Sequence, residues 1–207
     1  MNKHALVALL VAVAVAPAYA GDVYVVGSIG RSSADIDKNA LDNDLVTAGA
    51  TGISSNVDEE DTAYKAQLGY KFNENFAVEG GYADLGEASY SSTYSGGSAN
   101  AHVKASGPII AAVGIMPINE SFSVFGKLGV INAKVEADLN ATGPGGSATG
   151  SSNSTDLKPN WGAGVTYNIN NQLGIRAEYE QFRNLGDSNT TGESSVNLLS
   201  AGVVYTF

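Results

Sequence analysis

A histidine and a serine are the first residues whose types could do chemistry. Outside residues 1–20, His102 is the only histidine, and Ser106 follows it four positions later. A histidine that activates a neighbouring serine could hydrolyse an ester or transfer an acyl group. In a β-strand, however, four residues span about 13 Å, which is too far for a hydrogen bond between base and nucleophile. We therefore expect His102 to be a hydrogen-bonded surface residue, and we predict no catalytic site and no cofactor.

Charged residues at alternate positions form a second group. Glu79 alternates with apolar neighbours, and Arg176, Glu178 and Glu180 occupy every second position of one segment. A strand points successive side chains to opposite faces, so these charges share a face that is separate from the apolar one. The complete set is Lys65, Lys71, Glu79, Lys127, Arg176, Glu178 and Glu180. Which environment this face meets depends on the fold.

The segment 64–86, YKAQLGYKFNENFAVEGGYADLG, shows the pattern most clearly. It predicts two strands joined by a tight turn at residues 73–75, where Asn and Glu favour reversal. One face of this hairpin is apolar and the other is charged. In a soluble sandwich the charged face would meet water, whereas in a membrane barrel it would line the interior.

Residues 1–20 have the pattern of a cleaved signal peptide. Lys3 supplies a basic start, residues 5–16 are an apolar run, and Ala18-Tyr19-Ala20 is a cleavage pattern that makes Gly21 the expected first mature residue. The protein is therefore expected to be exported, with residues 21–207 as one domain. No later segment is long and apolar enough for a membrane helix, but a closed barrel also satisfies every backbone group in lipid.

Composition narrows the function classes. The formal net charge is -10, which leaves few cations for phosphates and argues against nucleic acid as a partner. Cysteine is absent, so no disulfide supports the fold. Glycine is abundant, at 25 residues, which suits bends and close packing inside a small barrel.

Eight strands are predicted, and the connections between them alternate between long and short. The strands occupy 23–31, two arms within 64–86, 101–116, 121–136, 160–169, 172–182 and 196–207. The long connections are 32–61, 87–100, 137–159 and 183–194. We expect 32–61 to be an exposed acidic loop. Residues 137–159 are of low complexity, and we expect them to bury too little apolar area to become ordered.

This alternation favours a barrel, because outer membrane barrels have short periplasmic turns and long external loops. Aromatic residues also gather near the short turns on the apolar face, as an interfacial girdle would: Tyr70, Phe72, Phe76, Phe122, Tyr167, Tyr205 and Phe207. We therefore predict an all-β, eight-stranded antiparallel up-and-down transmembrane β-barrel. Its charged inner face could be a selectivity lining, but eight strands enclose little more than side chains, which favours a paired polar core.

The chain from Val23 to Phe207 resembles the OmpA-type eight-stranded transmembrane domain of Gram-negative outer membranes, and the small opacity-like surface barrels. The resemblance is carried by LGYKFNENFAVEGGYADLG, LGIRAEYEQFRNLGD and the final AGVVYTF. It implies a lumen pair between Glu79 and Arg176. It also implies that Tyr205 and Phe207 belong to the terminal signal read by the outer membrane assembly machinery.

The chain departs from the family pattern at two strands. Ala112 and Val113 stand where the family has an interior lysine, and Thr166 stands where it has a glutamate. The resemblance therefore does not extend to a charge-swapping gate. Larger members continue into a periplasmic peptidoglycan-binding domain, a role that we do not carry over.

The expected function is a structural or surface-exposed role, such as adhesion, with at most small passive conductance. The alternatives are a small porin-like channel for ions or small solutes and, third, a lipid A-modifying enzyme. The expected partners are outer membrane lipid and lipopolysaccharide, the assembly machinery, and host or surface ligands at residues 32–61 and 137–159. We expect no specific metal site, because Ala40 and Val46 occupy positions where an EF-hand needs Gly and Glu.

Overall fold

The computed structural model describes residues 23–143, 146–187 and 191–207, so the predicted signal peptide and cleavage site lie outside the described residues. One helix and nine strands follow each other along these ranges. They are β1 Val23–Ala34, α2 Lys38–Thr47, β2 Ser54–Asp58, β3 Glu60–Lys71, β4 Phe76–Tyr94, β5 Gly97–Pro117, β6 Phe122–Gly143, β7 Gly146–Asn168, β8 Leu173–Asp187 and β9 Gly192–Thr206. No helix in the described ranges is long and apolar enough to cross a membrane.

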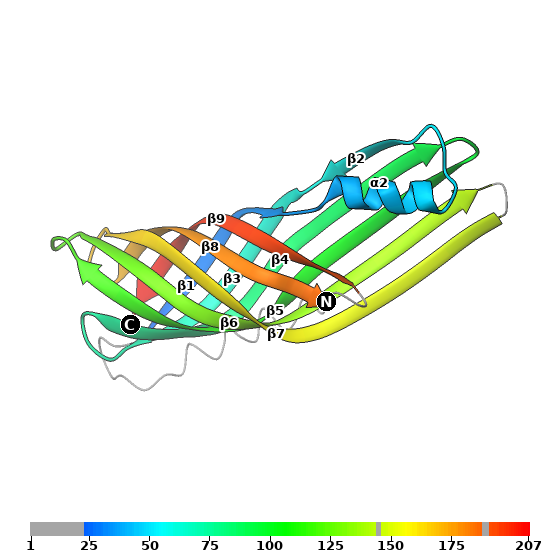
Figure 1. The fold of residues 1–207 in the computed structure, drawn as a ribbon. Helices are drawn as coiled ribbons and strands as arrows, with labels where there is room; N and C mark the ends of the chain where they lie inside the picture. The colour runs from blue at the N-terminus through cyan, green and yellow to red at the C-terminus, as the bar shows by residue number, and fades with distance from the viewer. Residues whose placement is uncertain (1–22, 144–145, 188–190) are drawn as a thin grey trace.

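Eight of the strands close into a ring (Figure 1). The order is β4-β3-β1-β9-β8-β7-β6-β5, and pairing of β5 with β4 completes it; every pair is antiparallel. The predicted fold class is confirmed. Strand β2 is an addition outside the ring, since it pairs with residues 89–93 at the far end of β4.

Three tight turns connect strands at one end of the barrel, which we call the turn rim. Each turn is built in the same way, because an asparagine Oδ1 accepts hydrogen bonds from the backbone N–H groups two and three residues later. Asn73, Asn119 and Asn170 make these contacts at 2.8–2.9 Å. Asparagine is suited to this role because its short side chain can replace a backbone acceptor in a turn.

At the opposite end, which we call the outer rim, the ribbons of β4–β5 and β6–β7 extend well past the other strands, with β2 and α2 beside them (Figure 1). The prediction that residues 87–100 and 137–159 form loops was wrong. Residues 87–94 and 97–104 remain paired, as do 135–143 and 146–154. These Ser- and Gly-rich strands bury little surface, but each satisfies its backbone groups against its neighbour, which composition does not reveal.

Two further connections also differ from the prediction. Residues 32–61 contain α2 and β2, and the helix is capped by Asp37, whose side chain accepts hydrogen bonds from Asn39 N and Ala40 N. Strands β8 and β9 extend through much of 183–194. The ends of β1 and β3 continue into 32–61, which agrees with the sequence, since its first two predicted strands can extend into this segment.

The barrel wall changes character between the two rims. Near the turn rim, outward side chains are apolar and exposed, as a lipid-facing band requires. All seven predicted girdle aromatics are exposed there, and three pairs of them are in ring contact: Tyr70 with Phe72, Phe122 with Tyr167, and Tyr205 with Phe207. Farther out, the outward positions become polar.

The interior is filled in layers. An apolar cluster next to the turn rim contains Tyr24, Val26, Ala77, Val113, Phe125 and Val204. A larger apolar cluster lies toward the outer rim and includes Leu85, Ile109, Ile131, Phe182, Leu185 and Leu198. The charged inner positions of β3, β4, β6 and β8 lie between these two clusters.

Candidate functional site

Glu79 is the centre of a charge network in the lumen. It projects inward from β4 and is fully buried. Its Oε1 accepts hydrogen bonds from Tyr24 Oη and Arg176 Nη1, each at 2.7 Å. Its Oε2 lies 2.8 Å from Lys127 Nζ. One carboxylate is thus held by three donors from three other strands, which is the condition under which a buried charge is tolerated.

Two lysines extend the network to β8. Lys127 Nζ lies 2.5 Å from Glu178 Oε1 and 3.8 Å from Glu180 Oε1. Lys65 Nζ lies 2.9 Å from Glu178 Oε2 and also contacts Glu180 Oε2. Gln67 contributes a weaker contact, with Oε1 3.4 Å from Lys127 Nζ. Lys127 therefore joins the Glu79 group to the Glu178–Glu180 group.

The network is balanced in charge. It contains three carboxylates, Glu79, Glu178 and Glu180, and three cations, Lys65, Lys127 and Arg176. All six residues are at most 5% exposed. Pairing these groups offsets the cost of removing each from water, so the network can fill the lumen without a counterion.

Aromatic rings position the cations of the network. The guanidinium carbon of Arg176 lies 4.4 Å from the centre of the Phe125 ring and 5.9 Å from that of Tyr24. The Tyr24 ring needs a glycine beside it, because a Cβ added at Gly69 would lie 2.1 Å from Tyr24 Cζ. Gly69 therefore leaves the space through which Tyr24 reaches Glu79.

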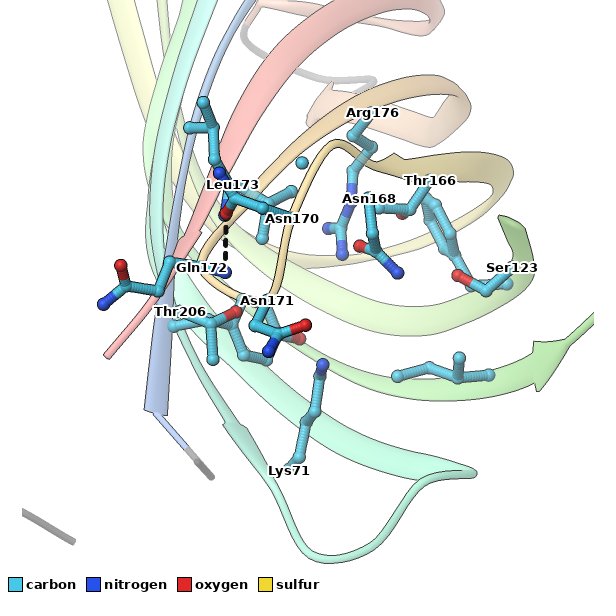
Figure 2. Close-up of a pocket in the computed structure, with 15 residues that line it drawn as sticks. Lys71, Ser123, Thr166, Asn168, Asn170, Asn171, Gln172, Leu173, Arg176 and Thr206 are labelled. Carbon is cyan, nitrogen blue, oxygen red and sulfur yellow. Dashed lines mark hydrogen bonds between the residues drawn. The ribbon is translucent and has the colours of Figure 1, made fainter. Parts of the chain in front are cut away.

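Lys71, the remaining predicted inner charge, lies outside this network. It faces a small cavity of about 50 Å³ at the turn rim, together with Arg176 and Thr166 (Figure 2). Figure 2 shows Lys71 and Arg176 entering this space from different strands. Lys71 Nζ lies 5.4 Å from the centre of the Tyr24 ring. The cavity ends at Tyr24 and Arg176, where the network begins.

The alternation in the sequence placed the six network charges on inward positions, but it did not identify Tyr24, Gln67 or Phe125 as their partners. Ala112, Val113 and Thr166 stand where the family pattern has charged residues. Charges at other positions, Lys127 on β6 and Glu178 on β8, complete a different network. These partners depend on the register across the ring.

The pair considered for acyl chemistry does not meet. His102 Nδ1 lies 2.6 Å from Glu87 Oε1, and Ser106 Oγ lies 3.0 Å from Tyr82 Oη. His102 is exposed at the outer rim, and its hydrogen-bond partner is a carboxylate of the neighbouring strand.

Comparison with known proteins identifies the family that has this architecture. The model of the OmpA-like transmembrane domain matches residues 18–207. The chain belongs to this family. Outer membrane protein A of Salmonella typhi is 34% identical over 140 residues, which are 67% of the chain and 38% of that protein. Outer membrane protein A of Yersinia pseudotuberculosis is 30% identical over 179 residues, which are 80% of the chain and 49% of that protein.

Two solved structures show the same fold at low sequence identity. Neisserial surface protein A has a TM-score of 0.55 at 16% identity, with 89% of this chain and 97% of that chain covered. The outer membrane protease OmpT from Escherichia coli has a TM-score of 0.51 at 12% identity, with 91% and 98% covered. The chain is therefore an outer membrane β-barrel of a Gram-negative bacterium, and it spans less than half the length of the curated relatives that it matches.

Proposed function

We propose that this barrel has a structural and surface-presenting role in the outer membrane and conducts little or nothing in its resting state. The observation that carries the proposal is the filled lumen. Six charged side chains, all nearly inaccessible to solvent, form one neutral network between two apolar clusters. A paired interior of this kind stabilises the ring of strands, and eight strands enclose little more than side chains, which supports a barrel that conducts little.

The outer rim supplies the surface-presenting part of the proposal. The ribbons of β4–β5 and β6–β7 extend well past the other strands (Figure 1). Their outer segments are rich in serine, threonine, asparagine and glycine. In outer membrane barrels the long connections face outward, so these ribbons would meet lipopolysaccharide and surface ligands. The segments 32–61 and 137–159 are the proposed contact regions, with α2 and paired strands in place of loops.

Conductance in planar bilayers tests the role. We expect the mature chain to show at most small, rare openings. We expect Lys127→Ala to raise conductance, because it removes the cation that joins the two halves of the network. Lys104→Ala is the matched control, since Lys104 forms an exposed ion pair with Glu87 at the outer rim. Steady conductance of the unmodified chain would instead establish the porin-like alternative.

Catalysis forms no part of the proposal. The residues that would serve a lipid A-modifying enzyme, His102 and Ser106, contact different partners on β4. The test is incubation of the refolded chain with lipopolysaccharide, followed by mass spectrometry of lipid A. A change in lipid A mass that His102→Ala abolishes would overturn the assignment.

A further inference from the structure

A cavity of about 600 Å³ lies inside the barrel at the outer rim. Its walls come from β1, β4, β5, β6, β7, β8 and β9, and residues of α2 border it. Its floor is the outer apolar cluster, because Leu85, Val135, Leu185 and Val196 belong both to that cluster and to the cavity lining. The size falls within the range of about 300–1,000 Å³ that is typical of sites for small organic molecules.

The alternation along β5 and β6 is inverted in this region relative to the lipid-facing band. On β6, Lys134 and Glu136 are exposed, whereas Val135 is buried in the interior and Ala137 lines the cavity. On β5, Lys104 is exposed while Val103 lines the cavity. A part of the wall that projects beyond the lipid meets water on its outer face. Apolar residues on its inner face therefore indicate that this face packs against another group or binds a ligand.

Much of this inner face remains uncovered. Leu139 lines the cavity and is 50% exposed, and Val103 is only partly buried. Apolar surface in contact with water is unfavourable, so covering it with an apolar molecule would be favourable. The wall chemistry therefore selects a largely apolar ligand.

The charges at the mouth of the cavity determine which sign of charge the ligand should carry. Residues 32–61, which contain α2, carry one lysine and eight acids: Asp35, Asp37, Asp42, Asp44, Asp58, Glu59, Glu60 and Asp61. Asp35, Asp37 and Glu59 are among the cavity-lining residues. Among the described residues, no lysine or arginine forms an ion pair with any of these three. A cleft bordered by charges of one sign concentrates ligands of the opposite sign.

We propose that the outer-rim cavity binds an apolar organic cation, a molecule with an aromatic or alkyl body and one positive charge. The apolar walls would bury its body, and the acidic mouth would attract its charge. An anionic amphiphile of the same shape would meet the same walls but would be repelled by the mouth. The cavity is thus assigned to a class of small molecule and not to the acidic lipid around the barrel.

Tetraphenylphosphonium and tetraphenylborate test this assignment, because they are apolar ions of matched shape and opposite charge. The mature chain would be placed in nanodiscs of zwitterionic lipid, and methyl NMR would report on individual sites. We expect tetraphenylphosphonium to shift the methyl signals of Val103, Val135 and Val196 in a saturable way. Signals of lipid-facing Leu68 and Val165 report partition into the bilayer and serve as the internal control.

Two variants fill the cavity from different strands. Ala101→Trp on β5 and Ala137→Phe on β6 should each weaken tetraphenylphosphonium binding by at least about tenfold, the effect expected when a bound apolar group loses its space. Ala148→Trp is the matched control, because Ala148 is exposed on β7 and does not line the cavity. Barrel formation of each variant is checked by heat-modifiable migration, and the second filling variant serves if the first does not fold.

A charge variant tests the second part of the assignment. In Glu59→Gln the amide oxygen can still accept the hydrogen bond from Ile36 N, which Glu59 Oε1 receives at 3.2 Å, so one charge is removed and the contact retained. A single charge about 7 Å away in a water-like medium should change affinity by about two- to threefold. Tetraphenylborate binding as tightly as tetraphenylphosphonium would overturn the cation assignment. Unchanged binding in both filling variants, or no saturable shift at the cavity methyls, would overturn the site.

Discussion

Arg176 donates a hydrogen bond to Glu79 across the lumen, with Nη1 2.7 Å from Oε1. The two residues are 97 positions apart, and three strands of the ring lie between β8 and β4 on one side. The pair therefore links opposite parts of the wall through the interior. Lys127 contacts the other oxygen of Glu79 from β6, so the carboxylate binds cations from two directions.

The first prediction is a double-mutant cycle on this pair. Glu79→Ala and Arg176→Ala should each lower the free energy of unfolding in urea by about 3–5 kcal/mol, since each leaves a buried charge without its partner. The double variant should cost less than the sum, with a coupling of about 0.5–3 kcal/mol. Recovery should be incomplete, because the double variant also removes a partner of Lys127 and the Arg176–Phe125 contact.

The exposed pair between Glu87 and Lys104 is the control for that cycle, with Oε2 2.9 Å from Nζ at the outer rim. Substitutions there should change the unfolding free energy by no more than about 1 kcal/mol, because solvent screens the interaction. Additive effects of Glu79→Ala and Arg176→Ala would show that the lumen contact contributes no energetic coupling.

The sequence could predict which charges point inward, but not the network that they form. Alternation is a local property, so it assigned Lys65, Lys127 and Glu178 to the inner face without their neighbours. Lys65 and Glu178 are 113 positions apart on strands that are not paired. Their contact depends on the stagger of the whole ring, and a single sequence does not contain that information explicitly. Only Glu79–Arg176 was predicted, and that came from family resemblance.

The second prediction concerns Gly69. Gly69→Ala places a methyl group 2.1 Å from the Tyr24 ring, so Tyr24 must move and Glu79 should lose one donor. We expect a loss of about 1–3 kcal/mol in unfolding free energy, the usual cost of overpacking. Gly114→Ala is the matched control, because a Cβ at Gly114 meets nothing within 4 Å. Equal stability of the two variants would contradict the role of Gly69.

The outer rim was the part of the fold that the sequence predicted least well. The eight membrane strands carry alternating apolar residues, a pattern that burial in lipid requires. Residues 146–154 carry almost none, yet they pair along their length with β6. Backbone hydrogen bonding can extend a hairpin without any apolar periodicity, so composition alone assigned these residues to a loop. The helix α2 was missed for a similar reason, as it has no buried residues.

The third prediction is a pH response of α2. Hydrogen bonds from Lys38 and Tyr90, together with the nearby Ser55 hydroxyl, lower the pKa of Asp42 to about 2 from its ordinary value of 3.8. Because the pKa of Asp42 is lowered in the folded state, its contacts stabilise the packing of α2 fully above about pH 4. This stabilisation is lost as the pH falls toward 2. A spin label at Val46→Cys, an exposed position of α2, should therefore become more mobile between pH 4 and pH 2.

Tyr90→Phe provides the test of cause, because Tyr90 Oη donates to Asp42 Oδ1 at 2.7 Å. Loss of this donor should move the mobility transition to higher pH. Asp42→Asn should remove the transition, since the amide does not titrate. A transition that persists in Asp42→Asn would assign the response to another acid.

The fourth prediction concerns orientation. Single cysteines in the turns, at Asn73, Asn119 or Asn170, should resist a membrane-impermeant maleimide on intact cells. A cysteine at Ala148 or Val46 should react, because both positions lie on the outer side of the apolar band. The chain has no native cysteine, so the background is low. Rapid labelling of Asn73→Cys on intact cells would reverse the proposed orientation.

The last prediction separates an assembly signal from a membrane anchor at Phe207. Its backbone N–H donates to Val23 O at 3.1 Å, and its ring lies 5.2 Å from that of Tyr205 in an edge-on contact. Phe72 makes the same kind of contact with Tyr70 at 5.2 Å, on the same rim. Both phenylalanines should anchor the barrel at the interface to a similar degree, since aromatic belts lie at this level. The family resemblance gives Phe207, and not Phe72, a part in the terminal assembly signal. We therefore expect Phe207→Ala, but not Phe72→Ala, to reduce the amount of heat-modifiable barrel in the outer membrane several-fold. Equal reduction in both variants would leave Phe207 as one girdle residue among seven, with no separate role in assembly.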